Sequence, residues 1–213
     1  DSVSLVNINP HDYAEGFIAE DSIKAAARAR GIEIGTSDVS PGTGAYLRHL
    51  AQLLSAQSVV EIGTGSGVGS LWLLEGMIKS GTLTSIDDEM EHSSIAKLAL
   101  AEADIAAPRF RLITNSVMDV MTKLADRAYD LVVFRHNPED LNFAISEAHR
   151  VLRSGGVFVI DNFFGGAKVP DPAQRDPKTI ALREAGKAIK ADSESWMSVL
   201  ITTGDGLLLA TKL

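Results

Sequence analysis

The chain alternates short apolar runs with longer amphipathic segments over most of its length. The short runs are rich in β-branched and other apolar residues and predict strands over 58–62, 82–87, 110–114, 130–134 and 157–161. All but the last precede segments with helical periodicity, which lie at 67–79, 93–103, 117–124 and 138–151. Such alternation predicts an α/β protein in which helices cover both faces of a mostly parallel sheet.

The two ends of the chain depart from this alternation. Before the first strand, apolar residues at helical spacing predict two helices, over 14–30 and 43–54. After a helix over 177–190, two β-rich runs at 196–202 and 207–212 are joined through Gly204-Asp205-Gly206. A connection this short indicates an antiparallel hairpin, so we expect one antiparallel strand near the end of the sheet.

Composition limits the number of domains and the classes of partner. The 213 residues are 45% hydrophobic and 23% charged, the balance of one globular domain with a core. We therefore expect a single domain over 1–213, with N-terminal helices in 1–55 and an α/β core in 56–213. The formal net charge of -8 argues against a broad basic surface for nucleic acid or anionic membrane. A small molecule is therefore a better candidate partner than nucleic acid or a membrane.

The lack of targeting signals and of cysteine limits where the protein is expected and which chemistry it can perform. No stretch approaches the roughly 18 apolar residues of a membrane span. The start, Asp1-Ser2-Val3-Ser4, lacks the basic-then-apolar pattern of a secretory signal, so we expect a cytoplasmic protein. The chain has no cysteine, which excludes thiolate catalysis and cysteine-ligated zinc and leaves oxygen or histidine as metal ligands.

Polar or charged side chains follow the predicted strands at their carboxyl ends. They are Glu61, Asp87, Asn115-Ser116, Arg135-His136 and Asp161-Asn162. In open parallel sheets, ligands bind beyond these ends, near the point where the strand order reverses. Polar residues also end many strands simply because the chain emerges into water, so none of them establishes a site alone.

The most specific motif is Glu61-Ile62-Gly63-Thr64-Gly65-Ser66-Gly67, between a predicted strand and a predicted helix. Glycines let the backbone approach a ligand closely and permit a tight turn. A dinucleotide site requires glycine or alanine where Val68 stands, and it places pyrophosphate on the helix N-terminus, where Glu61 would repel it. A carboxylate there favours S-adenosylmethionine, which carries an ammonium and a sulfonium and no phosphate.

A second carboxylate supports a nucleotide-like ligand. Asp87 ends the next predicted strand about twenty residues after the glycines, the separation at which an acidic side chain meets ribose hydroxyls. A glycine-rich turn alone could be only a connection between elements. The turn, its flanking Glu61 and the acid at Asp87 together favour a binding site.

Several separated motifs resemble one family. They are Val39-Ser40-Pro41-Gly42-Thr43-Gly44, the glycine motif with the preceding Val59-Val60, Tyr129-Asp130-Leu131-Val132-Val133-Phe134, Leu152-Arg153-Ser154-Gly155-Gly156, Asp161-Asn162, Asp171-Pro172, Thr179-Ile180-Ala181-Leu182-Arg183-Glu184 and Gly204-Asp205-Gly206-Leu207. They resemble the bacterial branch of the family that includes catechol and caffeoyl-CoA O-methyltransferases. The resemblance implies a Rossmann-like class I methyltransferase fold with seven strands, usually dimeric, that transfers methyl from S-adenosylmethionine to a hydroxyl oxygen.

The resemblance and the glycine motif together imply a set of cofactor contacts. By position these are Val39, Glu61, Gly63, Thr64, Gly65, Gly67, Gly69, Ser70, Asp87, Asp88, Ser116 and Arg135. The family often has serine where Gly69 stands.

The sequence departs from the family at the metal site. Metal-dependent relatives hold a divalent ion with an aspartate after the fourth strand and an Asp-Asn pair after the fifth. The pair is present as Asp161-Asn162, but the motif that usually reads Asp-Ala-Asp-Lys appears as Arg135-His136-Asn137-Pro138. Arginine stays protonated and cannot ligate a cation, and Pro138 replaces the lysine expected to help deprotonate the hydroxyl. We expect no tight metal site, with Asp161 and Asn162 as remnant ligands.

Two interpretations of this motif remain open. In one, Arg135 replaces the metal by pairing with Asp161 and facing an oxyanion, and His136 is the nearest candidate base. In the other, the site has decayed, Arg135 forms a structural ion pair and His136 is a surface residue. The other histidines show no ligand-like spacing, and we expect structural or solvated roles for them: His11, His49, His92 and His149.

The methyl acceptor is not identified by any motif. The segment 163–176 is expected to lie over the mouth of the site and to shape it. We predict an S-adenosylmethionine-dependent O-methyltransferase acting on a small-molecule hydroxyl, as a homodimer. The main alternative is a non-catalytic S-adenosylmethionine-binding protein derived from such an enzyme, and a nicotinamide-dependent oxidoreductase comes third.

Overall fold

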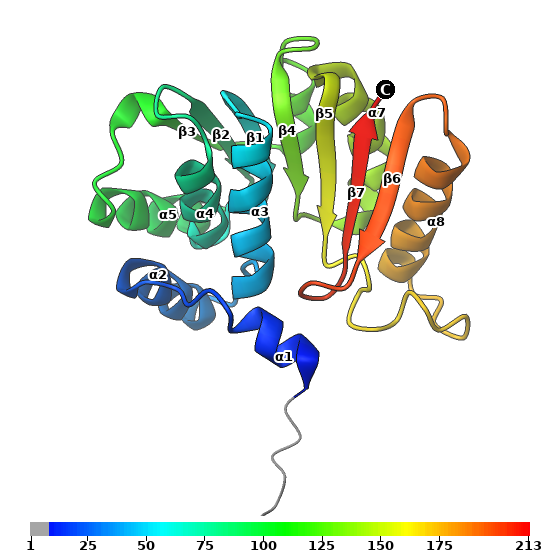
Figure 1. Cartoon of the computed structure of the whole chain (residues 1–213), viewed down its shortest axis with the longest axis horizontal. Coiled ribbons are helices and arrows are strands. Elements are labelled where there is room, and N and C mark those ends of the chain that lie inside the picture. The colour runs from blue at the N-terminus through cyan, green and yellow to red at the C-terminus, as the bar shows by residue number, and fades with distance from the viewer. Residues whose placement is uncertain (1–8) are drawn as a thin grey trace, which may run out of the picture.

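The computed structural model describes residues 9–213, which form one mostly parallel sheet with helices on both faces (Figure 1). The predicted lack of a secretory signal at Asp1–Ser4 lies outside the described residues. The strands are β1 (Ser58–Ile62), β2 (Thr82–Asp87), β3 (Phe110–Thr114), β4 (Tyr129–Phe134), β5 (Leu152–Asp161), β6 (Trp196–Ile201) and β7 (Leu207–Lys212). Their order across the sheet is β3-β2-β1-β4-β5-β7-β6.

One strand runs against the others, as predicted. β7 pairs antiparallel with both β5 and β6, while every other neighbouring pair is parallel. The predicted fold class, a seven-stranded sheet with one antiparallel strand, is confirmed.

Helices connect the parallel strands. They are α4 (Val68–Gly76), α5 (Met90–Glu102), α6 (Val117–Met121), α7 (Leu141–Val151) and α8 (Pro177–Ala191), with short 3-10 turns at η1 (Ala107–Arg109) and η2 (Pro138–Asp140). The predicted helix over 138–151 therefore divides into η2 and α7. β5 begins five residues earlier than the predicted 157–161, because 152–156 continues the strand with Gly155 at a positive φ of 78°.

The single helix predicted over 14–30 is wrong. The structure has two helices there, α1 (Pro10–Glu15) and α2 (Ser22–Glu33). Gly16 ends the first, and Asp21 caps the second by accepting hydrogen bonds from the N–H groups of Ile23 and Lys24. The next helix, α3 (Pro41–Leu53), begins two residues before the predicted 43–54, since Ser40 is its N-cap and Pro41 its first residue.

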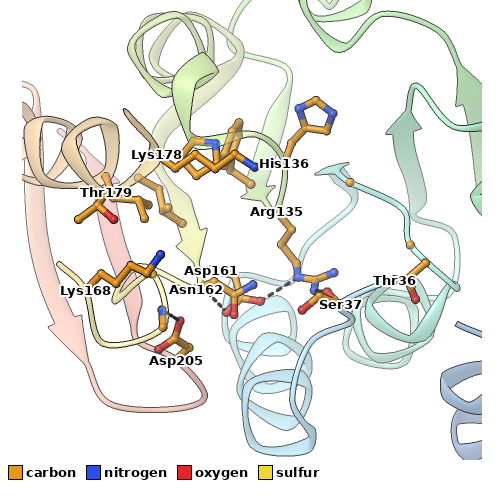
Figure 2. A pocket seen from close by; sticks show the side chains of 18 of the residues that line it. Thr36, Ser37, Arg135, His136, Asp161, Asn162, Lys168, Lys178, Thr179 and Asp205 are labelled. Atoms are coloured by element: carbon orange, nitrogen blue, oxygen red, sulfur yellow. Dashed lines mark hydrogen bonds and ion pairs between the residues drawn. The ribbon is translucent and has the colours of Figure 1, made fainter. Parts of the chain in front are cut away.

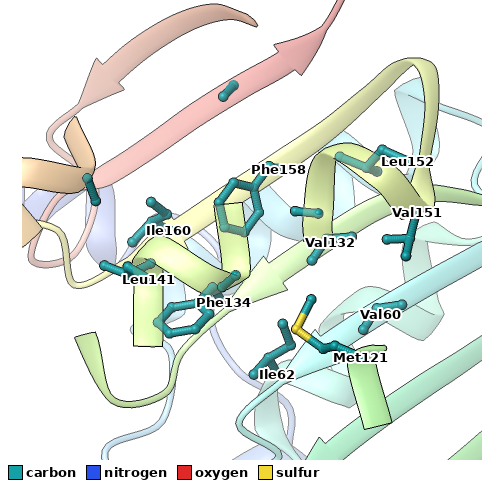
Figure 3. Packing of buried hydrophobic residues seen from close by; sticks show 14 of the residues in the cluster. Val60, Ile62, Met121, Val132, Phe134, Leu141, Val151, Leu152, Phe158 and Ile160 are labelled. Carbon is teal, nitrogen blue, oxygen red and sulfur yellow. The ribbon is translucent and has the colours of Figure 1, made fainter. Parts of the chain in front are cut away.

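Alternate residues of the central strands face two separate cores. Val60, Val132 and Phe158 point to one face, where they pack under α6, α7 and α8 (Figure 3). Their neighbours Val59 and Leu131 point to the opposite face, which α3, α4 and α5 cover. The period of two along each strand thus buries the sheet on both sides.

The sheet register brings three predicted site residues together at one edge. Ile62 of β1 pairs with Phe134 of β4, and Phe134 pairs with Ile160 of β5. The next residues of these strands, Gly63, Arg135 and Asp161, therefore emerge side by side. This is the position where the strand order reverses between β1 and β4, and where open α/β sheets bind ligands.

In the described part of the chain, no helix combines the length and apolar character that a membrane crossing requires.

Candidate active site

A cavity of about 710 Å³ opens at the carboxyl ends of β1, β4 and β5, a size typical of small-molecule sites. Eight predicted site residues line it: Gly63, Gly65, Asp87, Asp88, Arg135, His136, Asp161 and Asn162. The other predicted cofactor residues are not part of this lining: Val39, Glu61, Thr64, Gly67, Gly69, Ser70 and Ser116. The cavity has a half beside the glycine loop, which we call the cofactor half, and a half in front of Asp161, which we call the acceptor half.

Two glycines of the loop form the wall of the cofactor half. Gly63 has a φ of +95°, and a Cβ there would collide with the carbonyl group of Arg135. Gly65 has a φ of +56°, and a Cβ would lie 2.5 Å from Asp38 Oδ1. Both positions therefore need glycine for backbone conformation and for space. Gly67 instead allows close packing, since its Cβ would lie 2.9 Å from the Cα of Ala96 in α5.

Glu61 is a buried acid with a free acceptor atom. Its Oε1 accepts hydrogen bonds from Ser70 Oγ at 2.5 Å and from Ser85 Oγ at 2.7 Å. Its Oε2 is buried without a hydrogen-bond partner in residues 9–213, and a Cβ on Gly69 would lie 2.5 Å from it. Burial raises the pKa of Glu61 to about 7, against the opposing effects of the two serines and of Arg135.

Asp87 holds the glycine loop in place. Its Oδ2 accepts hydrogen bonds from the N–H groups of Thr64, at 2.9 Å, and Gly65, at 3.2 Å. Its Oδ1 accepts from Glu89 N at 2.9 Å, and His92 Nδ1 lies 3.1 Å from Oδ2. Asp87 is therefore a loop anchor as well as a candidate ligand. His92, for which we expected a structural or solvated role, supports this anchor and also lines the cavity.

Asp38 anchors the same loop from the N-terminal region and was missed by sequence reasoning. Its Oδ1 accepts from Ser66 N at 3.0 Å, and its Oδ2 accepts from Ser66 Oγ at 2.7 Å and Thr36 Oγ1 at 2.8 Å. The adjacent Val39 is buried, and its carbonyl accepts a hydrogen bond from Arg28. No motif around Asp38 indicated this contact.

Arg135 and Asp161 form a buried ion pair, as both interpretations of the motif expected. Arg135 Nε donates to Asp161 Oδ2 at 2.8 Å, and the side chains are 3% and 2% exposed (Figure 2). Arg135 Nη2 donates to the carbonyl of Ser37, whereas Nη1 has no hydrogen bond to any residue of 9–213. Asp161 Oδ1 accepts from Asn162 N at 2.8 Å, and Asn162 adopts the left-handed conformation, which asparagine tolerates.

This pair leaves no metal site of the family type. Both oxygens of Asp161 are engaged, and the Arg135 guanidinium occupies the position of the missing aspartate. In residues 9–213, no group of three or more histidine, aspartate or glutamate side chains is arranged to hold a metal ion. The residues present therefore do not fit a divalent ion.

His136 lies between two carboxylates at the rim of the cavity. Its Nε2 is 3.3 Å from Asp88 Oδ1, and its Nδ1 is 3.3 Å from Asp140 Oδ2, the latter outside hydrogen-bonding geometry. Its ring meets Phe134 edge-on, with the ring centroids 6.5 Å apart. These contacts hold the imidazole in the lining of the cavity.

The acceptor half contains polar and charged residues that sequence reasoning did not single out as site residues. They come from the segment 163–176, the start of α8 and the β6–β7 turn: Lys168, Asp176, Lys178, Thr179 and Asp205. The expectation that 163–176 shapes the mouth of the site is confirmed, since Gly165, Gly166 and Lys168 line it. Ser116 lies elsewhere, at the N-cap of α6, so its cofactor contact stays a prediction.

Comparisons with known proteins agree with this geometry. The model of a family described as O-methyltransferase matches residues 12–213. A candidate O-methyltransferase of Mycobacteroides abscessus is 46% identical over 200 residues, covering 94% of this chain and 93% of the relative. A crystal structure from Corynebacterium glutamicum superposes with a TM-score of 0.86 at 30% identity, covering 94% of both chains. The O-methyltransferase TomG from Streptomyces achromogenes, in complex with S-adenosylmethionine, gives 0.85 at 26% identity over 94% of both chains.

Proposed function

The chain belongs to the O-methyltransferase family and uses S-adenosylmethionine, and we propose that it methylates a hydroxyl of a small molecule without a tightly bound divalent metal. The observation that carries the proposal is the buried Arg135–Asp161 pair at the position of the family's metal site. Arginine is a permanent cation, so it supplies positive charge there without an ion from solution.

The cofactor half fits S-adenosylmethionine. The unpartnered Oε2 of Glu61 is a buried anionic acceptor, which suits the ammonium of the cofactor. The glycine loop leaves space along Gly63 and Gly65, and Asp87 lies beyond it as the acid for the ribose. We propose the same twelve residues as the cofactor set, with Glu61 and Asp87 as the charged members.

In the acceptor half, the chain's own residues would handle the proton and the charge. The bound cofactor supplies an electrophilic methyl group, which the acceptor oxygen takes as its O–H proton is lost, leaving S-adenosylhomocysteine. Arg135 Nη1, free of hydrogen bonds in residues 9–213, faces the oxyanion as it forms. His136 is the proposed base, with Asp88 and Asp140 holding its ring.

One observation favours the alternative, a non-catalytic S-adenosylmethionine-binding protein. Both nitrogens of His136 face carboxylates of the chain, and Pro138 stands where the family has its lysine. A base engaged in this way transfers a proton only if Asp88 moves aside. Product formation from any acceptor excludes this alternative.

Calorimetry and a transfer assay test the proposal. S-adenosylhomocysteine should bind and NAD should not, and binding of NAD alone would overturn the cofactor assignment.

Transfer of radiolabelled methyl to a panel of phenols should survive EDTA. The reason is that Arg135 repels a dication by roughly 4 kcal/mol per unit charge at a separation of 4 Å and an effective dielectric near 20. Arg135→Asp should instead create manganese binding. Micromolar manganese binding by the wild type through Asp161, or loss of activity with EDTA, would refute the metal-free proposal.

We also propose a homodimer. Aromatic side chains of the N-terminal region remain uncovered in one copy, since Tyr13 and Phe17 are 64% and 70% exposed. Light scattering at micromolar concentration should give about twice 22.7 kDa, and a mass near 22.7 kDa would contradict the dimer. The absence of a nucleic-acid partner stays a prediction from the net charge of -8.

A further inference from the structure

Every carboxylate of the acceptor half already accepts hydrogen bonds from the chain. Asp161 accepts hydrogen bonds from Arg135 Nε at Oδ2 and from the N–H group of Asn162 at Oδ1. Asp176 is the N-cap of α8 and accepts from Thr179 N at 3.1 Å and Thr179 Oγ1 at 2.7 Å. Asp205 accepts from Gly166 N at 2.7 Å. Their negative charges are therefore partly neutralised by fixed donors.

The two lysines of the acceptor half are not engaged in this way. Among the residues that the structure describes, Lys178 has no hydrogen bond or ion pair to a side chain. Lys168 Nζ comes only within 3.8 Å of its nearest carboxylate, Asp176 Oδ2, beyond hydrogen-bond distance. Figure 2 shows the Lys168 side chain extending from the loop toward Asp161 and Asn162, and the Lys178 side chain extending from α8 toward His136, on another side of the same cavity. Two ammonium groups thus line one cavity without hydrogen bonds to the residues that the structure describes, and only Lys168 has an ion pair, the long one with Asp176.

The cavity between them has an apolar wall. Phe134, Ile160 and Leu182 line it and are themselves almost fully buried, and Pro138 completes the same surface. Such a wall binds the body of a small organic molecule, while the lysines lie at the mouth. In a chain with 28 acidic and 20 basic residues, two ammonium groups without hydrogen bonds give an anion local partners against the general repulsion.

We infer that the methyl acceptor carries an anionic group, a carboxylate or a phosphate, which Lys168 and Lys178 bind while the apolar wall holds the rest of the molecule. This inference rests on the proposed function, because it assigns the hydroxyl to the position facing Arg135. The lysines are specificity-determining residues in this scheme, and they act on acceptor binding and leave cofactor binding unchanged.

A binding experiment with matched probes tests the inference. The protein is saturated with S-adenosylhomocysteine and titrated with 4-hydroxybenzoate and with 4-hydroxybenzamide, which has a similar shape and no charge. The acid should bind at least about tenfold more tightly, as expected for a charge-assisted hydrogen bond. Titration with 4-hydroxyphenyl phosphate distinguishes the two anion classes, since the better-bound anion identifies the natural one.

Variants assign the effect to the two lysines. Lys168→Met and Lys178→Met should each weaken binding of the preferred anion several-fold, and the double variant about 10- to 100-fold, without changing affinity for the amide. Lys187→Met is the control, because Lys187 lies on the same helix, pairs with Glu184 and does not line the cavity. All three lysines are exposed, so the variants should fold, which thermal unfolding verifies.

The outcomes distinguish a failure of the inference about the lysines from a failure of the proposed function. Equal binding of acid and amide, no binding of any probe, or an unchanged double variant would overturn the inference while S-adenosylhomocysteine binding stands. Failure to bind S-adenosylhomocysteine in the first step would count against the proposed function instead.

Discussion

The two halves of the cavity are built in different ways. The cofactor half is built around one continuous loop, in which Gly63 and Gly65 supply backbone and space. Asp87 accepts hydrogen bonds from the loop N–H groups of Thr64 and Gly65, and Asp38 accepts from that of Ser66. The acceptor half is assembled from side chains of β4, β5, α8 and two loops that are far apart in the sequence.

The difference extends to charge. The cofactor half is lined by the carboxylates of Asp87 and Asp88, and the buried acid Glu61, next to the glycine loop but outside the lining, has a free oxygen that suits a cation. The acceptor half has Arg135, Lys168 and Lys178, which suit an oxyanion and an anionic substituent. One cavity thus presents opposite charges to the two molecules that it would bring together.

The largest expected effect is a loss of stability when the buried Arg135–Asp161 pair of the acceptor half is broken. Arg135→Ala should destabilise the protein by about 3 to 5 kcal/mol, because Asp161 is then left buried without a counter-charge. Urea unfolding at neutral pH measures this directly. The matched control is Arg153→Ala, since Arg153 pairs with Asp130 on the surface and is 40% exposed, so its loss should cost at most about 1 kcal/mol. Equal costs for the two variants would contradict the buried-pair account.

In the cofactor half, Glu61→Gln should have opposite effects on binding and stability. Folding raises the pKa of Glu61 from 4.5 to about 7, so the folded state holds a proton that the unfolded state releases. The stability due to this group is present below pH 4.5 and is lost as pH rises through about 7, a difference worth roughly 3 kcal/mol. At pH above 7, the glutamine variant should therefore be more stable by up to about 3 kcal/mol, while cofactor affinity falls.

The raised pKa of Glu61 also predicts that binding of S-adenosylhomocysteine depends on pH. S-adenosylhomocysteine carries the same ammonium as the cofactor, so its affinity for the wild type should fall about tenfold per pH unit below pH 7. Calorimetric titration and urea unfolding at two pH values test both effects. A glutamine variant that binds the ligand as tightly as the wild type would remove Glu61 from the site.

Substitution of Asp87 should cause a smaller loss, in the affinity for S-adenosylhomocysteine. Asp87→Ala should weaken S-adenosylhomocysteine binding by about 1.5 to 3 kcal/mol, because charge-assisted hydrogen bonds to the ligand and to the loop amides are both lost. Glu91→Ala is the control, since Glu91 is an exposed acid on the next helix. If a folded Asp87 variant keeps its affinity in calorimetry, Asp87 does not belong to the site.

The sequence predicted the sheet and located the glycine loop. β1 and β2 match their predicted bounds because every residue after the first is buried, so the apolar pattern marks both ends. The glycine loop was found because its residues are contiguous. The break between α1 and α2 at Gly16 and the early start of β5 were missed, since both depend on local capping and strand pairing.

Only part of the acceptor half could be predicted from the sequence: Arg135, His136, Asp161 and Asn162 were named, whereas Lys168 and Lys178 were not. The direction of Lys168 depends on how the segment 163–176 folds over the sheet. That fold is fixed by Arg183, which donates hydrogen bonds to the carbonyl oxygens of Val169, Asp171 and Gln174. Such contacts between a helix side chain and a distant loop backbone leave no periodic pattern, so tertiary structure is needed to find them.

Anomalous diffraction from a crystal soaked with S-adenosylhomocysteine and manganese chloride tests the central claim most directly, because it reports on both halves at once. The account predicts density for the ligand along the glycine loop, with its amine at Glu61 Oε2. It also predicts no manganese peak near Asp161, which stays paired with Arg135. A manganese ion bound by Asp161 and Asn162, with Arg135 displaced, would contradict the account.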